Sequence, residues 1–198
     1  MLVDTAVASM VVGKLRGGTL LSLGGVPLKR VECILASFAI ETAVVGLGFR
    51  GTPVVRPVAP YAFFLGYVLL LCAIWANRHI RWMPLIGVGV ALNFVVILSN
   101  GMRMPVSADM LNAVGMARQV AAIESGNVLT YRLIDATTRL WPLGDVIPIG
   151  SPYPIHRVIS IGDIVMAIGV FLLIQHEMLA RRSPRVRLGR RAGTLKRG

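Results

Sequence analysis

Residues Val58–Ala76, with the sequence VAPYAFFLGYVLLLCAIWA, contain no charged side chain. As an α-helix at about 1.5 Å per residue, this stretch covers roughly 29 Å, close to the ~30 Å hydrocarbon core of a bilayer. Tyr61 and Trp75 lie near its two ends, where aromatic side chains suit the membrane interfaces. The stretch therefore predicts a transmembrane helix.

Further apolar runs lie on both sides of this stretch. Three have spanning length, and one is shorter: Val31–Gly48, Met83–Ser99, Val158–Leu179 and the short Met1–Gly13. The first thirteen residues cover only roughly 20 Å as a helix. The expected fold is an all-α integral-membrane bundle of about five transmembrane helices, or four if the first segment does not span, plus an amphipathic outer helix.

Composition supports the membrane class. Hydrophobic residues make up 55% of the 198-residue chain, charged residues only 15%, and mean hydropathy is +0.71. Soluble domains carry about 25% charged residues. The net charge of +12 is compatible with nucleic-acid binding. However, the basic residues flank apolar runs, as the positive-inside rule requires, so no nucleic-acid partner is expected.

The distribution of basic residues predicts the orientation. With five spans, fourteen of the 21 Lys and Arg residues fall on the side of the C-terminus, eight of them in the tail. The N-terminus is therefore expected outside and the C-terminus inside. Residues 1–179 form the expected bundle, with an outer region at 100–157. Residues 180–198 form a basic, disordered cytoplasmic tail, which would attract anionic lipid head groups by about 1 kcal/mol per basic residue.

The outer region is expected to be partly helical. Apolar residues recur at helical spacing through Ser107–Glu124, and Ser107 suits an N-cap. A second helix is predicted over Val128–Leu140. Proline and glycine between 142 and 154 are expected to prevent regular structure there.

Two short strings fit helix caps and also candidate binding residues. Asn100-Gly101 closes the fourth apolar run, and Arg103 follows it, a pattern typical of a helix C-terminus. Ser160 and Asp163 have the spacing of an N-terminal capping box. The functional alternative is that Asp163 dips into the membrane and pairs with an arginine.

A third string, Thr137–Pro148, places Arg139 and Asp145 among apolar residues. A charge held in such a place needs a partner. Arg103, Arg139, Asp145 and Asp163 would balance one another near the outer membrane face. Asp145 and Asp163 are then candidate catalytic carboxylates, because two acids in different environments can divide acid and base roles. The alternative is a set of separate charges, each satisfied locally.

Glu41 lies in the middle of an apolar run, and an intramembrane acid is a candidate for proton or cation handling. Its alternative is a hydrogen-bonded carboxyl within the bundle. Gly87 and Ala91 form a small-xxx-small face suited to helix packing. The scattered histidines and two cysteines indicate neither a metal site nor a cofactor. The candidate ligand-binding residues are Glu41, Asn100, Arg103, Arg139, Asp145, Ser160 and Asp163.

Three motifs together resemble a bacterial family of small membrane proteins known only as a domain of unknown function. They are NGMRMPVS at 100–107, TRL at 138–140 with LGDVIP at 143–148, and SIGD at 160–163; LRGG at 15–18 accompanies them. The resemblance covers roughly residues 1–178. Met102 stands where the family pattern suggests a second glycine. The resemblance implies several spans in a bacterial cytoplasmic membrane and supplies no activity.

Two functions remain open on the sequence. One is a non-enzymatic membrane protein, either a small-ligand or ion-binding bundle or an accessory subunit with a membrane protein partner. The other is a membrane enzyme that acts on lipid or cell-envelope substrate at the outer face through the Arg and Asp residues.

Overall fold

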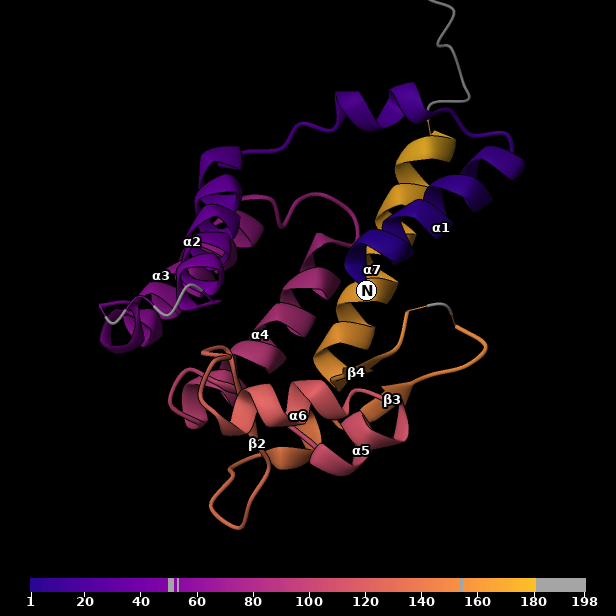
Figure 1. Ribbon diagram of the computed structural model, residues 1–198. Coiled ribbons are helices and arrows are strands. Elements are labelled where there is room, and N and C mark those ends of the chain that lie inside the picture. Colours follow the sequence, from indigo (N-terminus) through magenta and orange to yellow (C-terminus); the bar gives the residue numbers. More distant parts are fainter. Residues whose placement is uncertain (50–51, 53, 154, 181–198) are drawn as a thin grey trace, which may run out of the picture.

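The computed structural model describes residues 1–49, 52, 54–153 and 155–180. Most of this chain is helical, and the long helices gather above a cap of short elements (Figure 1). The long helices are α1 (Leu2–Leu15), α2 (Val31–Phe49), α3 (Val55–Ala76), α4 (Met83–Ser99) and α7 (Ile161–Ala180). A 3₁₀ helix, η1 (Leu20–Gly25), follows α1. The expected disordered tail lies outside the described residues.

Three helices are long and apolar enough to cross a membrane, namely Val31–Gly48 within α2, all of α3 and all of α7. By helix length and composition, the chain is a multi-pass membrane protein. The apolar helix α4 is shorter, with 17 residues, and α1 has 14. The predicted bounds of α4 agree with the structure. The predicted fifth run began at Val158, whereas α7 begins at Ile161 because the preceding residues form a strand.

Helices α4 and α7 pack closely through glycines. A Cβ added at Gly89 would lie 2.6 Å from the Gly162 carbonyl oxygen of α7. One added at Gly169 would lie 2.9 Å from the Ile86 backbone nitrogen of α4. Gly87 of the expected small-residue face instead approaches Ile74 of α3. Small residues on α4 therefore serve two helix contacts.

Helix α1 packs against the opposite side of α7 through buried polar groups. The Ser9 hydroxyl donates to the Phe171 carbonyl at 2.9 Å, and the Gln175 amide donates to Ser9. At the far end, Arg157 pairs with Asp4 at 2.6 Å. These contacts attach a helix that is too short to span a bilayer core alone.

The α2/α3 hairpin stands to one side of the α1/α4/α7 group (Figure 1). Its main connection is between α3 and α4, where Phe63 packs near Val96 and Ile97 in one buried cluster. Asn77, which follows α3, joins the two open ends of the hairpin: its side chain accepts from Lys29 N, just before α2, at 2.7 Å and donates to Lys29 O. The hairpin is thus held mainly along one edge.

The cap corrects the all-α expectation. It contains α5 (Ala108–Ala113), α6 (Ala117–Glu124), η2 (Trp141–Leu143) and four short strands. Strand β1 (Met104–Val106) pairs in parallel with β2 (Tyr131–Leu133), and β3 (Ile147–Ile149) pairs antiparallel with β4 (Arg157–Ile159). Their apolar side chains surround Leu111, which is 1% exposed. Strand pairing here supplies the backbone hydrogen bonds that a helix would otherwise make.

Three expectations for the outer region were wrong in detail. The single amphipathic helix is broken into α5 and α6 at Gly115, whose φ of +76° ends α5. The predicted helix at Val128–Leu140 is instead β2 followed by a turn around Asp135. The segment expected to be irregular contains β3, since Pro148 can occupy a two-stranded edge.

Candidate functional site

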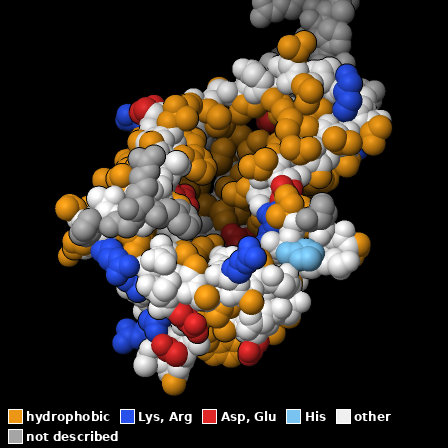
Figure 2. Space-filling model, in the orientation of Figure 1, with side chains coloured by type: hydrophobic (Ala, Val, Ile, Leu, Met, Phe, Trp, Pro, Cys, Tyr) orange, Lys and Arg blue, Asp and Glu red, His pale blue; other side chains and the backbone are white. Residues whose placement is uncertain are grey.

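A cavity of about 790 Å³ lies between the α2/α3 hairpin and the α4/α7 pair, above the cap. Figure 2 shows this hollow, walled largely by hydrophobic side chains, with acidic atoms deep inside it. Its ionisable or strongly polar lining residues are Glu41, Tyr67, Asn93, Arg118, Tyr131, Asp145 and Asp163. Three carboxylates from distant parts of the chain therefore reach one space.

Asp163 is held by a complete set of hydrogen bonds. Its backbone N–H donates to the Ser160 hydroxyl oxygen at 3.0 Å, and Ser160 N–H donates to its carboxylate at 3.3 Å. These two bonds confirm the predicted capping box. Asn93 of α4 adds a third, donating to the carboxylate at 2.9 Å, while the Ser160 hydroxyl donates to Asn93 at 2.8 Å.

Among the described residues, no arginine forms an ion pair with Asp163, so that expectation was wrong. Asn93 bonds to the Asp163 carboxylate instead. Close packing at Gly162 explains the choice. A side chain at Gly162 would overlap the Asn93 carboxamide oxygen. The close approach of α4 and α7 leaves little room for a longer side chain in that place.

Asp145 is positioned by its backbone. Its N–H donates to the Pro105 carbonyl at 2.8 Å, and its carbonyl accepts from Ser107 N–H at 3.0 Å. This approach to β1 needs glycine at 144, since a Cβ there would lie 2.6 Å from Pro105 O. Pairing of β3 with β4 then brings the segment after Asp145 alongside the residues that precede Ser160.

The Asp145 side chain differs sharply from that of Asp163. It is 5% exposed, and its Oδ1 atom is buried without a hydrogen-bond partner among the described residues. Burial, and then the nearby Asp163 carboxylate, raise the pKa of Asp145 to about 8. Near neutral pH, Asp145 is therefore mostly protonated. The two aspartates share a cavity but not an environment.

Glu41 reaches the cavity from α2, while Tyr67 of α3 and Tyr131 of β2 line it between the acids. Burial, and then the charge of Asp145, raise the pKa of the Tyr131 phenol well above its ordinary value. Arg118 of α6 is the one cation among the described lining residues, and no ion pair joins it to the three carboxylates. Formal negative charge therefore exceeds positive charge in the cavity.

Of the four charges expected to converge, the structure gathers only the two aspartates. Arg139 is exposed, and its backbone rather than its side chain is engaged. The Asn100 side chain accepts from Arg139 N–H at 3.0 Å and donates to Arg139 O at 2.8 Å. Asn100 thus closes α4 as predicted and also fastens the 138–140 segment. Gly101 and Met102 both have positive φ, which explains why glycine suits position 102.

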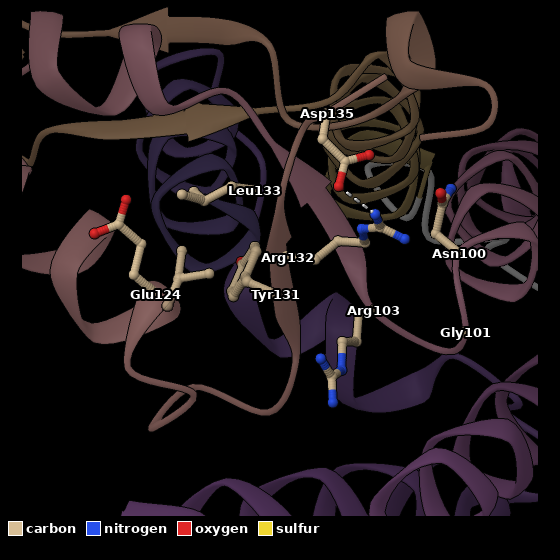
Figure 3. Close-up of a pocket in the computed structure, with 9 residues that line it drawn as sticks. Asn100, Gly101, Arg103, Glu124, Tyr131, Arg132, Leu133 and Asp135 are labelled. Carbon is tan, nitrogen blue, oxygen red and sulfur yellow. Dashed lines mark hydrogen bonds and ion pairs between the residues drawn. The ribbon is translucent and has the colours of Figure 1, made fainter. Parts of the chain in front are cut away.

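Arg103 belongs to a separate pocket of about 580 Å³ in the cap, which Asn100 also lines. Figure 3 shows Arg132 directed at Asp135 in this pocket, with an ion-pair distance of 2.8 Å. Glu124 and Arg103 are its other charged residues. Two of the predicted ligand-binding residues, Asn100 and Arg103, therefore line this pocket and not the acidic cavity.

Sequence reasoning missed Asn93, Tyr67 and Tyr131 as lining residues. A buried amide in an apolar run was a usable signal for Asn93, because polar side chains in membrane helices usually have partners. The tyrosines gave no such signal, since tyrosine also suits membrane interfaces. In the described part of the chain, no group of three His, Cys, Asp or Glu side chains has an arrangement that could hold a metal ion.

Parts of the three motifs lie close together: Asp145 of the second bonds to β1 of the first at Pro105, and it shares the cavity with Asp163 of the third. Residues 25–175 match the family of unknown function DUF5317. The chain belongs to this family. An uncharacterized protein of Thermotoga maritima is 32% identical over 133 residues, which covers 64% of this chain and 72% of the relative. No solved structure matches the chain.

Proposed function

We propose that this DUF5317 chain is a non-enzymatic membrane protein that binds a small ligand in the cavity between the α2/α3 hairpin and the α4/α7 pair. The observation that carries the proposal is a space of about 790 Å³ with mainly apolar walls and a few convergent polar groups. Small-molecule sites usually have this size and character. The acidic groups concentrate at the end built by the family motifs.

Membrane placement follows from the same arrangement. We propose five spans in a bacterial cytoplasmic membrane, with α1 and α4 crossing as shorter helices packed on α7. The N-terminus is outside, and the basic tail inside meets anionic lipid head groups. The cap then faces outward and closes the acidic end of the cavity. An accessory role beside a membrane protein partner is compatible with this placement.

An enzymatic role is the second candidate, favoured by one observation. Asp145 and Asp163 line the same cavity in different environments: Asp145 Oδ1 has no hydrogen-bond partner among the described residues, whereas the Asp163 carboxylate accepts from Asn93. The proposed Arg and Asp cluster, however, needed Arg103 and Arg139, and these lie elsewhere. Ligand binding needs only the cavity itself, so we prefer it.

A cavity-filling substitution tests the binding proposal. Ala122 of α6 lines the cavity, whereas the adjacent Ala121 is exposed and points away from its lining. We expect Ala122→Trp to abolish saturable binding of ligand-sized probes to the full chain in lipid nanodiscs, and Ala121→Trp to preserve it. The probes are phenylbutyl-trimethylammonium, its neutral carbon isostere and phenylhexanoate, each measured by calorimetry against empty nanodiscs. Failure of all three to bind would reject the proposal.

A further inference from the structure

We propose that the cavity ligand is a monovalent organic cation, a protonated amine or quaternary ammonium with an apolar body, that seats its charge against Asp145 and displaces a proton. This inference rests on the proposed binding function and adds the chemical class of the ligand. It starts from one atom: Asp145 Oδ1 is buried and has no hydrogen-bond partner in the described chain. A buried polar atom without a partner costs about 1–3 kcal/mol, so it calls for a bound partner or a functional explanation.

The surroundings of Asp145 favour a cation as that partner. The titratable groups that share its cavity are Asp163 of α7, Glu41 of α2, Tyr67 of α3, Tyr131 of β2 and Arg118 of α6. Asp163 already uses its carboxylate on Asn93 and Ser160. An anionic ligand would add charge beside two or three carboxylates, which is electrostatically unfavourable. A monovalent cation that replaces the Asp145 proton adds no negative charge and pairs with the carboxylate.

The walls favour an organic body over a bare ion. Phe63, Leu70 and Val90 are among the side chains that line the larger part of the cavity. A hard metal ion needs about six or more oxygen ligands close together, and the described chain has no such group of acidic, histidine or cysteine side chains. Tyr67 and Tyr131 supply aromatic rings, which attract ammonium groups by cation–π interaction.

Protonation of Asp145 makes the exchange electroneutral. Near neutral pH the empty cavity holds the neutral acid, because its pKa lies at about 8. When the cation enters, the Asp145 O–H bond breaks, the proton leaves to solvent, and the carboxylate pairs with the ammonium group. One positive charge enters as one leaves. The cavity therefore never holds an added, unbalanced charge.

The test uses calorimetry on the full chain in phosphatidylglycerol nanodiscs, whose head groups carry no amine. Phenylbutyl-trimethylammonium should bind at least tenfold more tightly than its neutral carbon isostere. Titrations at pH 7 in two buffers with different protonation enthalpies should show release of close to one proton per cation. The dissociation constant should tighten about tenfold from pH 6 to pH 7 and level off above about pH 8.

Asp145→Asn should abolish proton release and weaken cation binding at least tenfold. The exposed Asp109 of α5 provides the matched control, since Asp109→Asn removes one acid from the same cap without altering the cavity. If Asp145→Asn fails to fold, the wild-type pH dependence still decides. Equal or tighter binding of the neutral isostere or of phenylhexanoate would overturn the cation inference and leave the binding function intact.

Phosphatidylethanolamine nanodiscs distinguish a lipid amine from a free one. If the head group of that lipid is the ligand, it should compete and weaken probe binding in those nanodiscs. A free amine ligand predicts equal probe affinity in both lipids. In either case the probe must release the proton. Absence of proton release in both lipids would overturn the inference.

Discussion

The α4/α7 pair and the α2/α3 hairpin are both pairs of apolar helices, yet they treat polar groups differently. Between α4 and α7, Asn93 and Asp163 bond across the helix contact, and glycines bring the backbones together. In the hairpin, Ser37 bonds within its own helix to Ile34 O, and Glu41 faces the cavity. One pair is fastened by its polar residues. The other leaves Glu41 facing the cavity.

This difference distinguishes a helix pair whose polar residues hold it together from a pair whose acid faces the cavity. The α4/α7 pair holds Asp163 in place at the cavity through Asn93. The hairpin supplies a wall that is connected mainly through α3. Substitutions between α4 and α7 should therefore change mainly the free energy of unfolding, and substitutions on the hairpin should change it less. Four predictions follow, from the largest expected effect to the smallest.

The largest expected effect is at the glycine contact. Gly162→Ala places a methyl group against Asn93 and within 2.8 Å of the Gly89 carbonyl. We expect a loss of about 3 kcal/mol in the free energy of unfolding, since overpacking forces the helices apart. Gly46→Ala on α2, where a Cβ would meet nothing within 4 Å, should be neutral or stabilising by up to about 1 kcal/mol. Reversible denaturation in mixed micelles measures the free energy of unfolding of both variants. Equal losses would contradict the difference between the α4/α7 pair and the hairpin.

Asn93→Ala should have the next largest effect. It leaves the Ser160 hydroxyl and the Asp163 carboxylate without their cross-helix partner, at a cost of about 1–3 kcal/mol. Ser37→Ala, which removes a bond made only within α2, should cost less than about 0.5 kcal/mol. The same denaturation assay applies. A loss in Ser37→Ala as large as that in Asn93→Ala would show that the hairpin is fastened too.

Asp145 predicts how stability depends on pH. Its pKa is raised in the folded protein to about 8, from an ordinary value of 3.8. The folded state therefore holds this proton more tightly than the unfolded state does. The contribution is fully present below about pH 4 and is lost as pH rises toward 8. We expect the free energy of unfolding to fall steadily across this window. Asp145→Asn should flatten the profile, and an unchanged slope would refute the assignment.

The smallest effect on stability is expected at Glu41. This side chain is exposed on α2 and makes no ion pair among the described residues, so Glu41→Gln should shift unfolding by less than about 0.5 kcal/mol. If the cavity serves transport, the same variant should change proton-linked uptake of the trimethylammonium probe into proteoliposomes. Glu32→Gln, on the same helix but paired with Arg30 at 3.6 Å, is the control. Unchanged uptake in Glu41→Gln would exclude transport that depends on Glu41.

The helices were the most predictable part of the fold. Runs such as Met83–Ser99 have few ways to satisfy their backbones in a membrane except as helices, so composition alone located them. The cap was not predictable to the same degree. Val128–Leu140 has helical periodicity, but pairing of Tyr131 with Met104 overrides that local preference. Gly115 broke a helix that apolar spacing alone would have continued.

The candidate site shows the same division. Ser160 and Asp163 were predictable as a capping box because both partners lie within one helical turn. The prediction that Arg103 and Arg139 converge with the aspartates rested on charge balance. Charge balance does not determine where each side chain points. The Asn100 side chain, which bonds to the Arg139 backbone, and the close approach of Gly144 to Pro105 decide where those segments point.

By itself, the sequence determined the membrane class, the family motifs and the approximate positions of the long helices, because these depend on composition and on bonds between near neighbours. Only the tertiary structure decided that Glu41, Asp145 and Asp163 share one cavity and that Asn93 rather than an arginine meets Asp163. The physical reason is that long-range placement follows from close packing and strand register. Both depend on contacts between residues that lie far apart in the chain.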